Sequence, residues 1–268
     1  MKEKNLNNRS KTNSGILFFF EKIIRSHPFL YFIIRSLIRY TNIFEEDAKG
    51  VNYINFKKKI NIIDVGASDG ISAKFFLNNL NVNKVFCYEP YKPFVEKIKK
   101  LNNKKIIIKP YAIGKKSENH EIYYPRYTLF GKNFDLITYT YYDKKSLIKQ
   151  IKLDFLFHKN INLIKDTIKI NLFKSPKSKI DLIKIDVNGF ELSVLKTMIK
   201  CLKKDRPVIL LETGSDIKRI NNFLKKLSYK QYKFEIKSKK FQNIKKKEYP
   251  LNTYFIYKKN LNLINKNV

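Results

Sequence analysis

Four carboxylates follow apolar runs in a chain that is otherwise strongly basic. They are Asp64, Glu89, Asp186 and Glu212. The 268 residues include 56 Lys and Arg against 23 Asp and Glu, a formal net charge of +33. Carboxylates can accept hydrogen bonds from hydroxyl groups, attract a bound cation, or accept a proton during a reaction. Their concentration at the ends of apolar runs makes them the first candidates for chemistry.

The first carboxylate precedes a turn that contains glycine. Residues 60–70 read INIIDVGASDG, which predicts a buried strand that ends near Asp64 and a turn that leads into a helix. The turn residues of interest are Gly66, Ala67, Ser68 and Gly70. Glycine lets a chain turn sharply and lets a ligand approach the backbone. A dinucleotide fingerprint would also need glycine at positions 68 and 71, which hold Ser68 and Ile71, so an NAD site is disfavoured.

The second carboxylate ends the next apolar run, which reads VFCYEP. Glu89 stands 23 residues after Gly66 and is followed by Pro90. An acid at the end of the second strand of such a fold can accept hydrogen bonds from both hydroxyls of a ribose. The glycine turn and Glu89 together predict a nucleoside-binding site.

The third and fourth carboxylates end two further apolar runs, IDLIKIDVNGFELSVLKTM and RPVILLE. The first run carries Lys184 and Asp186 to its end, Gly189 turns the chain, and Glu191 begins a helix. The second run ends in Glu212. Acids gathered here would stabilise a nearby sulfonium cation.

The elements that must position these residues alternate along the chain. Strands are predicted at 60–65, 84–88, 105–109, 180–187, 207–212, 231–236 and 253–258, and helices at 70–80, 92–101, 189–203 and 216–227. Apolar strands separated by helices predict an α/β fold with a mainly parallel sheet covered on both faces. Ligands of such sheets bind at the carboxyl ends of the strands, where the four carboxylates are expected.

These segments resemble, in order and spacing, the FkbM-type family of S-adenosylmethionine-dependent methyltransferases. The motifs that carry the resemblance are DVGASDG, YEP, AIG at 112–114 and KIDVNGFE. The resemblance covers about residues 57–215 and implies a class I, Rossmann-like methyltransferase fold. That fold has a mainly parallel seven-stranded sheet with a final antiparallel strand. It also implies S-adenosylmethionine as cofactor and O-methylation, often of sugars or secondary metabolites.

The resemblance assigns roles residue by residue. The cofactor-binding set is Asp64, Gly66, Ala67, Ser68, Gly70, Glu89, Pro90 and Ala112. The catalytic set is Asp186 and Glu191, with Asp186 the first choice for the group that accepts the acceptor's proton and His120 a distant second. Asn188 stands where the family usually has glutamate, which puts an acidic role for that side chain in doubt.

Cysteine and histidine give no metal site. Cys87 and Cys201 lie in apolar segments and are expected to be buried and unpaired. His27, His120 and His158 show no ligand spacing, so no zinc site is expected.

The chain is expected to have two parts, the second of which contains an insertion. Residues 1–50 form a basic, amphipathic helical extension, and residues 51–260 form the methyltransferase domain. Charged residues interrupt the apolar stretch at 15–40, so no uncharged run in it is long enough to span a bilayer. It is either a helical pair that packs on the domain or a basic helix that rests on anionic lipid. Residues 124–170 are the expected acceptor-binding insertion, whose tyrosines suit either stacking on sugars or bases, or a half-buried strand.

The predicted function is O-methylation of a hydroxyl of a carbohydrate, glycolipid or similar small acceptor. The charge suggests an RNA methyltransferase as an alternative, although lysine is spread through all segments and forms no single stripe. A non-catalytic, membrane-associated module with the same fold is a second alternative, disfavoured by the intact Asp64, Glu89 and Asp186. The expected partners are a small-molecule or glycan acceptor and, through residues 15–40, an anionic membrane, with nucleic acid less favoured. The expected location is cytoplasmic, with peripheral contact at the inner membrane surface.

Overall fold

The computed structural model describes residues 45–154, 161–187, 189–214, 216–244 and 249–264. The chain divides into two compact units. Among the described residues, those up to 118 and those from 169 onward belong to the larger unit, and those between 119 and 168 belong to the smaller. The expected N-terminal helices lie outside the described residues. No helix within the described ranges is long and apolar enough to cross a membrane.

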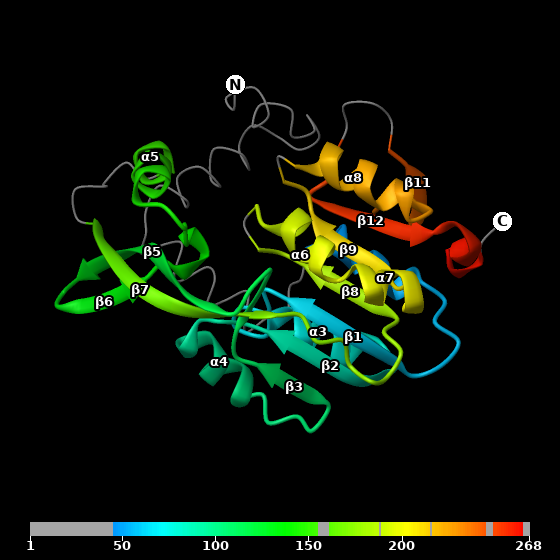
Figure 1. Cartoon of the computed structure of the whole chain (residues 1–268), viewed down its shortest axis with the longest axis horizontal. Coiled ribbons are helices and arrows are strands. Elements are labelled where there is room, and N and C mark those ends of the chain that lie inside the picture. The colour runs from blue at the N-terminus through cyan, green and yellow to red at the C-terminus, as the bar shows by residue number, and fades with distance from the viewer. Residues whose placement is uncertain (1–44, 155–160, 188, 215, 245–248, 265–268) are drawn as a thin grey trace. The chain divides into compact units, whose positions relative to one another are not determined.

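The larger unit is built on an eight-stranded sheet with the order β11-β10-β12-β9-β8-β1-β2-β3 (Figure 1). The strands are β1 (Ile60–Val65), β2 (Val82–Tyr88), β3 (Ile106–Lys109), β8 (Leu182–Ile185), β9 (Val208–Glu212), β10 (Tyr229–Glu235), β11 (Lys240–Asn243) and β12 (Asn252–Tyr257). Neighbours from β3 to β9 are parallel, whereas β12 is antiparallel to β9 and to β10. The mainly parallel α/β sheet with a final antiparallel strand is thus confirmed.

The prediction of seven strands in this sheet is wrong by one strand. β11 pairs antiparallel with β10 at the edge of the sheet. Its sequence, KFQN, holds a single apolar residue, and three of its four residues are exposed. An exposed edge strand buries too little apolar surface to leave a pattern in the sequence.

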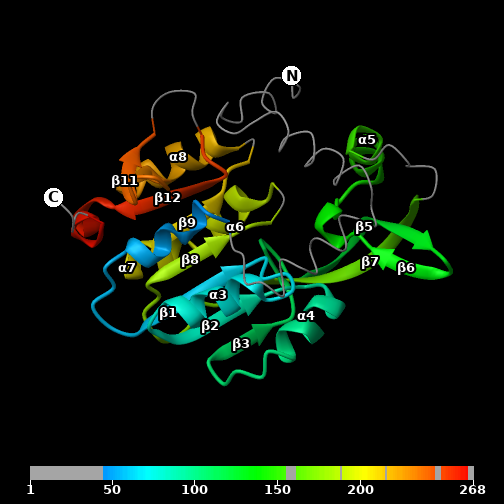
Figure 2. The same cartoon turned by 180° about the vertical axis from the view of Figure 1, so that it is seen from behind.

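The two faces of the sheet carry separate cores, because alternate residues of each strand point to opposite sides. Ile62, Leu182 and Leu210 pack with α3 (Ile71–Asn79) and the 3-10 helix η1 (Ala48–Tyr53), which Figure 2 shows in front of the sheet. Ile63 and Ile183 pack with α6 (Glu191–Thr197), α7 (Ile199–Asp205) and α8 (Ile217–Lys226), which lie in front in Figure 1. Helix α4 (Lys92–Lys99) adds Ile98 to the first core. Cys87 and Cys201 are buried and free, as expected.

The helix predicted at 189–203 is two helices. Between α6 and α7, the Met198 N–H donates to the carbonyl oxygens of both Val194 and Leu195. The Thr197 hydroxyl donates to the Val194 carbonyl oxygen at 2.7 Å. A threonine that bonds back to its own helix in this way weakens the regular ladder and favours a bend.

The smaller unit holds strands that the sequence did not predict. β5 (Glu118–Leu129) forms a hairpin with β6 (Lys132–Asp135), and α5 (Lys144–Asp154) and β7 (Ile161–Leu172) follow. Its core contains Leu136, Leu147 and Ile151. The last residues of β7 continue into the larger unit, where they pair in parallel with β4 (Ala112–Gly114).

Candidate active site

The carboxyl ends of the parallel strands in the larger unit are in register. Val65 on β1 is paired with Tyr88 on β2 and with Ile185 on β8, and Ile185 is paired with Leu211 on β9. The next residue of each strand therefore stands in one row along the sheet edge. In the order β2, β1, β8, β9, this carboxyl-edge row is Glu89, Gly66, Asp186 and Glu212. Glu212 is paired in turn with Asn252 at the start of β12.

Gly66 is required by packing against the neighbouring strand. Its φ of +75° lies in the left-handed region, and an added Cβ would stand 1.9 Å from the carbonyl oxygen of Asp186. Its N–H donates to the Tyr88 carbonyl oxygen at 3.0 Å. The sequence pattern explained this glycine by the close approach of a ligand. The structure adds a second reason, because the Asp186 backbone leaves no room for a side chain at this position. Gly70, with φ +85°, makes the last turn before α3.

Glu89 is buried and held by backbone donors on both sides. Its Oε2 accepts the N–H of Ser68, in the glycine turn, at 2.8 Å, and its Oε1 accepts the N–H of Tyr91 at 2.9 Å. Burial raises the pKa of Glu89 to about 7, against the lowering effect of these two N–H groups. Each oxygen keeps a second lone pair, so the carboxylate fits a ribose with two adjacent hydroxyls. Ser68 and Glu89 are therefore in direct contact, and their role in cofactor binding stays a prediction.

Asp64 is fully buried and faces a buried cation. Its Oδ2 accepts the Ser72 hydroxyl of α3 at 2.5 Å, and its Oδ1 lies 3.4 Å from the Lys184 ammonium. A carboxylate removed from water in this way needs such partners to stay charged. Asp64 therefore fixes the base of the turn between β1 and α3 from inside the protein.

Lys184 joins the ends of two neighbouring strands, β1 and β8. Its Nζ donates to the Gly66 carbonyl oxygen at 3.1 Å and to Asp186 Oδ2 at 3.4 Å, in addition to its pairing with Asp64. Burial lowers the pKa of Lys184, but the charges of Asp64, Asp186 and Glu45 outweigh burial and hold that pKa above its usual range. The ammonium therefore stays charged although only 11% of its side chain is exposed.

Asp186 and Glu212 form a carboxyl pair on adjacent strands. Burial, the negative charge of Asp186 and a hydrogen bond with it raise the pKa of Glu212 to about 8, whereas Lys184 acts in the opposite direction. The Asp186 side chain is 43% exposed, so this member of the pair can meet a substrate. Two carboxyls this close share a proton readily, because both cannot ionise without repulsion. The pair is suited to accept a proton near neutral pH.

The segment before η1 adds two more acids beside this pair. Asn252 Nδ2 donates to Glu45 Oε2 at 2.6 Å and to Asp47 Oδ1 at 2.9 Å. The Asn252 N–H donates to Asp47 Oδ2 at 2.8 Å. The charge of Glu45 contributes to the raised pKa of Glu212. The acids of the site thus come from both ends of the larger unit's sequence.

Glu191 turns back toward its own loop. It is buried, and its Oε1 accepts the Gly189 N–H at 2.9 Å. Burial raises the pKa of Glu191, whereas hydrogen bonds from the N–H groups of Gly189, Glu191 and Val187 lower it. These contacts hold the turn between β8 and α6, and a catalytic role for Glu191 stays a prediction. Asn188 lies outside the described residues.

Some of the remaining predicted residues adjoin the row in the sequence, and others belong to other elements. Ala67 follows Gly66 and donates its N–H to the Tyr88 carbonyl oxygen at 3.3 Å, and Pro90 follows Glu89 directly. Ala112 begins β4, in the second sheet. His120 lies in the smaller unit, with its ring centroid 5.0 Å from that of Tyr142. In the described ranges, no three His, Cys, Asp or Glu residues are arranged to hold a metal ion.

Two residues of the site received no individual role from the sequence, although Glu212 was counted among the acids that would stabilise a sulfonium cation. Lys184 precedes Asp186 by two positions, so both lie on the same face of β8. Glu212 ends a buried strand, as Asp64 and Glu89 nearly do. Two signals in the sequence could have identified these residues as part of the site. Lys184 is a polar residue two places before a strand-end acid, and Glu212 is a carboxylate at the end of the next predicted strand.

The comparisons with known proteins identify the family. The sequence profile of the Methyltransferase FkbM domain matches residues 64–234, which is more than half of the 268 residues. No curated protein sequence matches the chain.

Similar solved structures include methyltransferase FkbM from Methylobacillus flagellatus KT, at 13% identity and TM-score 0.48, over 75% of this chain and 44% of that one. They also include the plantazolicin methyltransferase BpumL in complex with SAH (S-adenosylhomocysteine), at 11% identity and TM-score 0.44, over 88% and 95% of the two chains. A third is precorrin-6y C5,15-methyltransferase from Geobacter metallireducens GS-15, at 12% identity and TM-score 0.38, over 78% and 86%. The chain thus spans less than half of the first of these proteins.

The family match covers the β1 carboxylate, the glycine turn, Glu89 and the Lys184–Asp186 strand end. S-adenosylmethionine is the methyl donor of the family that this match identifies. This chain belongs to the FkbM family of S-adenosylmethionine-dependent methyltransferases.

Proposed function

We propose that this chain methylates a hydroxyl oxygen of a carbohydrate, glycolipid or similar small acceptor. The observation that carries the proposal is the in-register row that joins Glu89, Gly66, Asp186 and Glu212. One end of the row suits a ribose, and the other end suits a group that loses a proton. A hydroxyl is such a group, because its oxygen becomes an ether only after the proton leaves.

The cofactor-binding half of the row has the donor and acceptor pattern that the methyl donor needs. Glu89 would hold the two ribose hydroxyls, with the Ser68 and Tyr91 N–H groups fixing the carboxylate in place. The small residues Gly66, Ala67 and Gly70 would let the backbone of the turn lie close to the cofactor. Asp64 would hold the turn in place through its buried contacts with Ser72 and Lys184. Pro90 and Ala112 complete the set that the family resemblance implies. When bound, the cofactor supplies a methyl group already activated by its sulfonium.

The chain's own residues then have two tasks, alignment and proton removal. Alignment of an acceptor with a reactive group can account for up to about 7–11 kcal/mol of a barrier. Asp186 would take the hydroxyl proton, with Glu212 as the neighbour that shares it. Because the Asp186 side chain is partly exposed, it can return the proton to water.

Residues 124–170 would contribute to recognition of the acceptor, as the sequence predicts. Half-buried tyrosines there, such as Tyr127, Tyr141 and Tyr142, offer ring faces and hydroxyls that suit sugar rings. A membrane contact through residues 15–40 would bring a glycolipid acceptor close, and would give the chain a cytoplasmic, peripheral location. These residues lie outside the described ranges.

The test is methyl transfer in solution. Purified protein with S-adenosylmethionine and a panel of glycans and glycolipids should yield a product whose added mass and fragmentation place the methyl group on oxygen. Methylation of nitrogen, or of no acceptor in the panel while SAH binds normally, would contradict the hydroxyl assignment. Absence of any SAH binding by calorimetry would contradict the methyltransferase proposal as a whole.

The net charge of +33 favours RNA as a second candidate acceptor. Binding to phosphates through lysines would fall steeply as salt rises, because counterions are released on association. Measured affinity for tRNA or rRNA that drops over tenfold between low and moderate salt, with methylated RNA as product, would support this candidate. A lack of binding at moderate salt would remove it.

A further inference from the structure

Lys184 is a buried cation at the meeting point of the two halves of the site. Its contacts are with the Gly66 carbonyl oxygen at 3.1 Å, Asp186 Oδ2 at 3.4 Å and Asp64 Oδ1 at 3.4 Å. A buried charge is costly unless each of its partners is well placed. The ammonium has three N–H donors, and these three contacts can satisfy all of them. The contacts with Gly66 and Asp186 connect the cofactor turn with the carboxylate proposed to accept the proton.

The three partners come from the ends of two neighbouring strands, because Asp64 and Gly66 both belong to the end of β1. Gly66 follows β1 in the turn whose N–H groups reach Glu89 through Ser68. Asp186 follows β8, and its N–H donates to the Val65 carbonyl oxygen at 3.0 Å. Backbone pairing sets the spacing of β1 and β8, and the Lys184 ammonium adds a side-chain contact to both the glycine turn and the Asp186 carboxylate.

We propose that Lys184 is a positioning residue that ties the turn at Gly66–Gly70 to the Asp186 carboxylate, so that cofactor binding and proton acceptance depend on the same buried cation. This inference rests on the proposed function, because it needs the turn to hold the cofactor. Lys184 acts through these groups and is not assigned a contact with the substrate.

The charges around Lys184 predict how its loss would be felt. Its neighbours among the titratable groups are Asp64 on β1, Cys87 and Glu89 on β2, Asp186 after β8, Glu212 on β9 and Glu45 before η1. Lys184 lowers the pKa of Glu89 and of Glu212. Removal of the ammonium should therefore raise both values and shift their ionisation to higher pH.

The experiment compares Lys184→Met, which removes the charge, with Lys184→Arg, which keeps it. Lys84→Met is the matched control, since Lys84 lies on β2 and its ammonium donates to the Lys104 carbonyl oxygen at 3.2 Å. The affinity for SAH is measured by calorimetry from about pH 5.5 to 8.5, the range in which Glu89 is expected to titrate. Thermal unfolding is followed for each variant.

Lys184→Met should weaken SAH binding about tenfold or more at pH 8, the size expected for the loss of a charge-assisted hydrogen bond. It should also move the midpoint of the pH dependence to higher pH. Lys184→Arg should restore the midpoint, and Lys84→Met should behave like the unmodified protein. A cation that only supported the fold would lower the melting temperature and leave the midpoint unchanged.

Lys184→Met leaves Asp64 without its cation and so carries a risk of misfolding. The double variant Lys184→Met/Asp64→Asn removes both charges together and should remain folded, with the same weakened SAH binding. Wild-type affinity and midpoint in either folded variant would overturn the inference and leave the proposed function intact. If the unmodified protein itself fails to bind SAH, the proposed function is wrong and the inference falls with it.

Discussion

The two edges of the central sheet use carboxylates in different ways. At the carboxyl edge, burial is the main cause that raises the pKa values of Glu89 and Glu212, to about 7 and about 8. At the amino edge, around Asp181 and Asp205, each acid accepts a backbone N–H of a neighbouring segment. The same residue types therefore serve different ends at the two edges.

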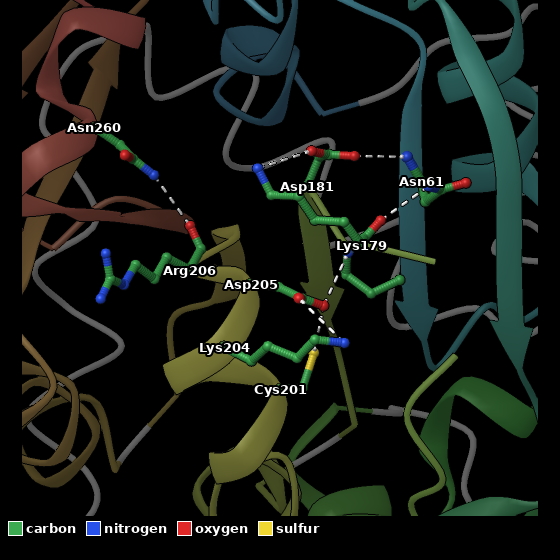
Figure 3. Close-up of polar contacts among 9 residues, drawn as sticks. Asn61, Lys179, Asp181, Cys201, Lys204, Asp205, Arg206 and Asn260 are labelled. Atoms are coloured by element: carbon green, nitrogen blue, oxygen red, sulfur yellow. Dashed lines mark hydrogen bonds and ion pairs between the residues drawn. The ribbon is translucent and has the colours of Figure 1, made fainter. Parts of the chain in front are cut away.

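Figure 3 shows the amino edge in detail. Asp181 Oδ2 accepts the Asn61 N–H at 3.0 Å, and the Asn61 side chain donates to the Lys179 carbonyl oxygen at 2.9 Å. Asp205 Oδ2 accepts the Ile180 N–H at 3.0 Å, and the Cys201 thiol lies 3.8 Å from the same oxygen. These contacts link the segment before β8 to β1 and to the end of α7.

The contrast indicates where function is concentrated. Amino-edge acids satisfy donors that would otherwise lack partners where strands begin, which stabilises the fold. At the carboxyl edge, burial costs stability but raises the pKa values of Glu89 and Glu212 toward neutrality, whereas Lys184 acts in the opposite direction. Substitutions at the two edges should accordingly change different measured quantities.

The largest contrast is expected from the two aspartates that flank β8. Asp186→Asn should lower turnover by about 10²–10⁴, the usual contribution of a positioned proton acceptor, with SAH affinity much less affected. Asp181→Asn, at the other end of the same strand, is the matched control and should keep its turnover. Rates per folded molecule, measured once an acceptor is known, decide the question. Full turnover by Asp186→Asn would show that Asp186 only supports the turn.

A smaller effect is expected from the loss of the Glu89 carboxylate. Glu89→Ala should weaken SAH binding by at least about tenfold, because charge-assisted hydrogen bonds to the ribose are worth about 1.5–3 kcal/mol. Calorimetry measures the change, with Glu235→Ala at the end of β10 as the control on another strand. Unchanged SAH affinity in Glu89→Ala would remove Glu89 from the cofactor site.

The pH dependence of SAH binding should report on the same carboxylate. Since burial raises the pKa of Glu89 from 4.5 to about 7, the ionised form that accepts hydroxyls is lost as the pH falls through about 7. Affinity should fall about tenfold from pH 8 to pH 6, since one pKa unit corresponds to a factor of ten. Glu89→Gln should lack this dependence.

The pH dependence of stability has the opposite sign, because Glu89 ionises at lower pH in the unfolded chain than in the folded protein. The contribution of Glu89 to the free energy of unfolding therefore declines as pH rises from about 4.5 to 7.

The smallest effect on function is expected at the amino edge. Asp205→Ala should lower the free energy of unfolding by about 1–3 kcal/mol, because the buried Ile180 N–H loses its acceptor. Asp205→Asn keeps an acceptor oxygen and should lose less. Urea denaturation measures the change, and SAH affinity should be unaltered in both variants. A large loss of affinity in folded Asp205→Asn would break the division between the two edges.

Much of the sheet could be predicted from the sequence. The strand predicted at 60–65 matches β1 at both ends, and every residue of INIIDV is buried. A short, mainly apolar run that ends at a glycine turn favours a buried strand over a helix, because it is too short for a typical helix. The first glycine turn and Glu89 followed from the same local pattern. Each of these signals is contained within a few consecutive residues.

The smaller unit could not be predicted in the same way. β7 reads INLIKDTIKINL, in which charged and apolar residues mix and only one side chain is buried. β5 is similarly broken by Glu121 and Arg126, and the Arg126 guanidinium pairs with Asp135 across the hairpin. Strands that bury little apolar surface leave no clear period in the sequence.

The sequence by itself determined which acids end strands and which turns hold glycine. Only the tertiary structure decided which of them meet. Lys184 reaches Gly66, 118 positions away along the chain, and Asn252 binds Asp47 from 205 positions away. The raised pKa of Glu212 beside Asp186 and the buried state of Lys184 depend on the register between strands. Register is set by the packing of both faces at once, which no local stretch of sequence contains.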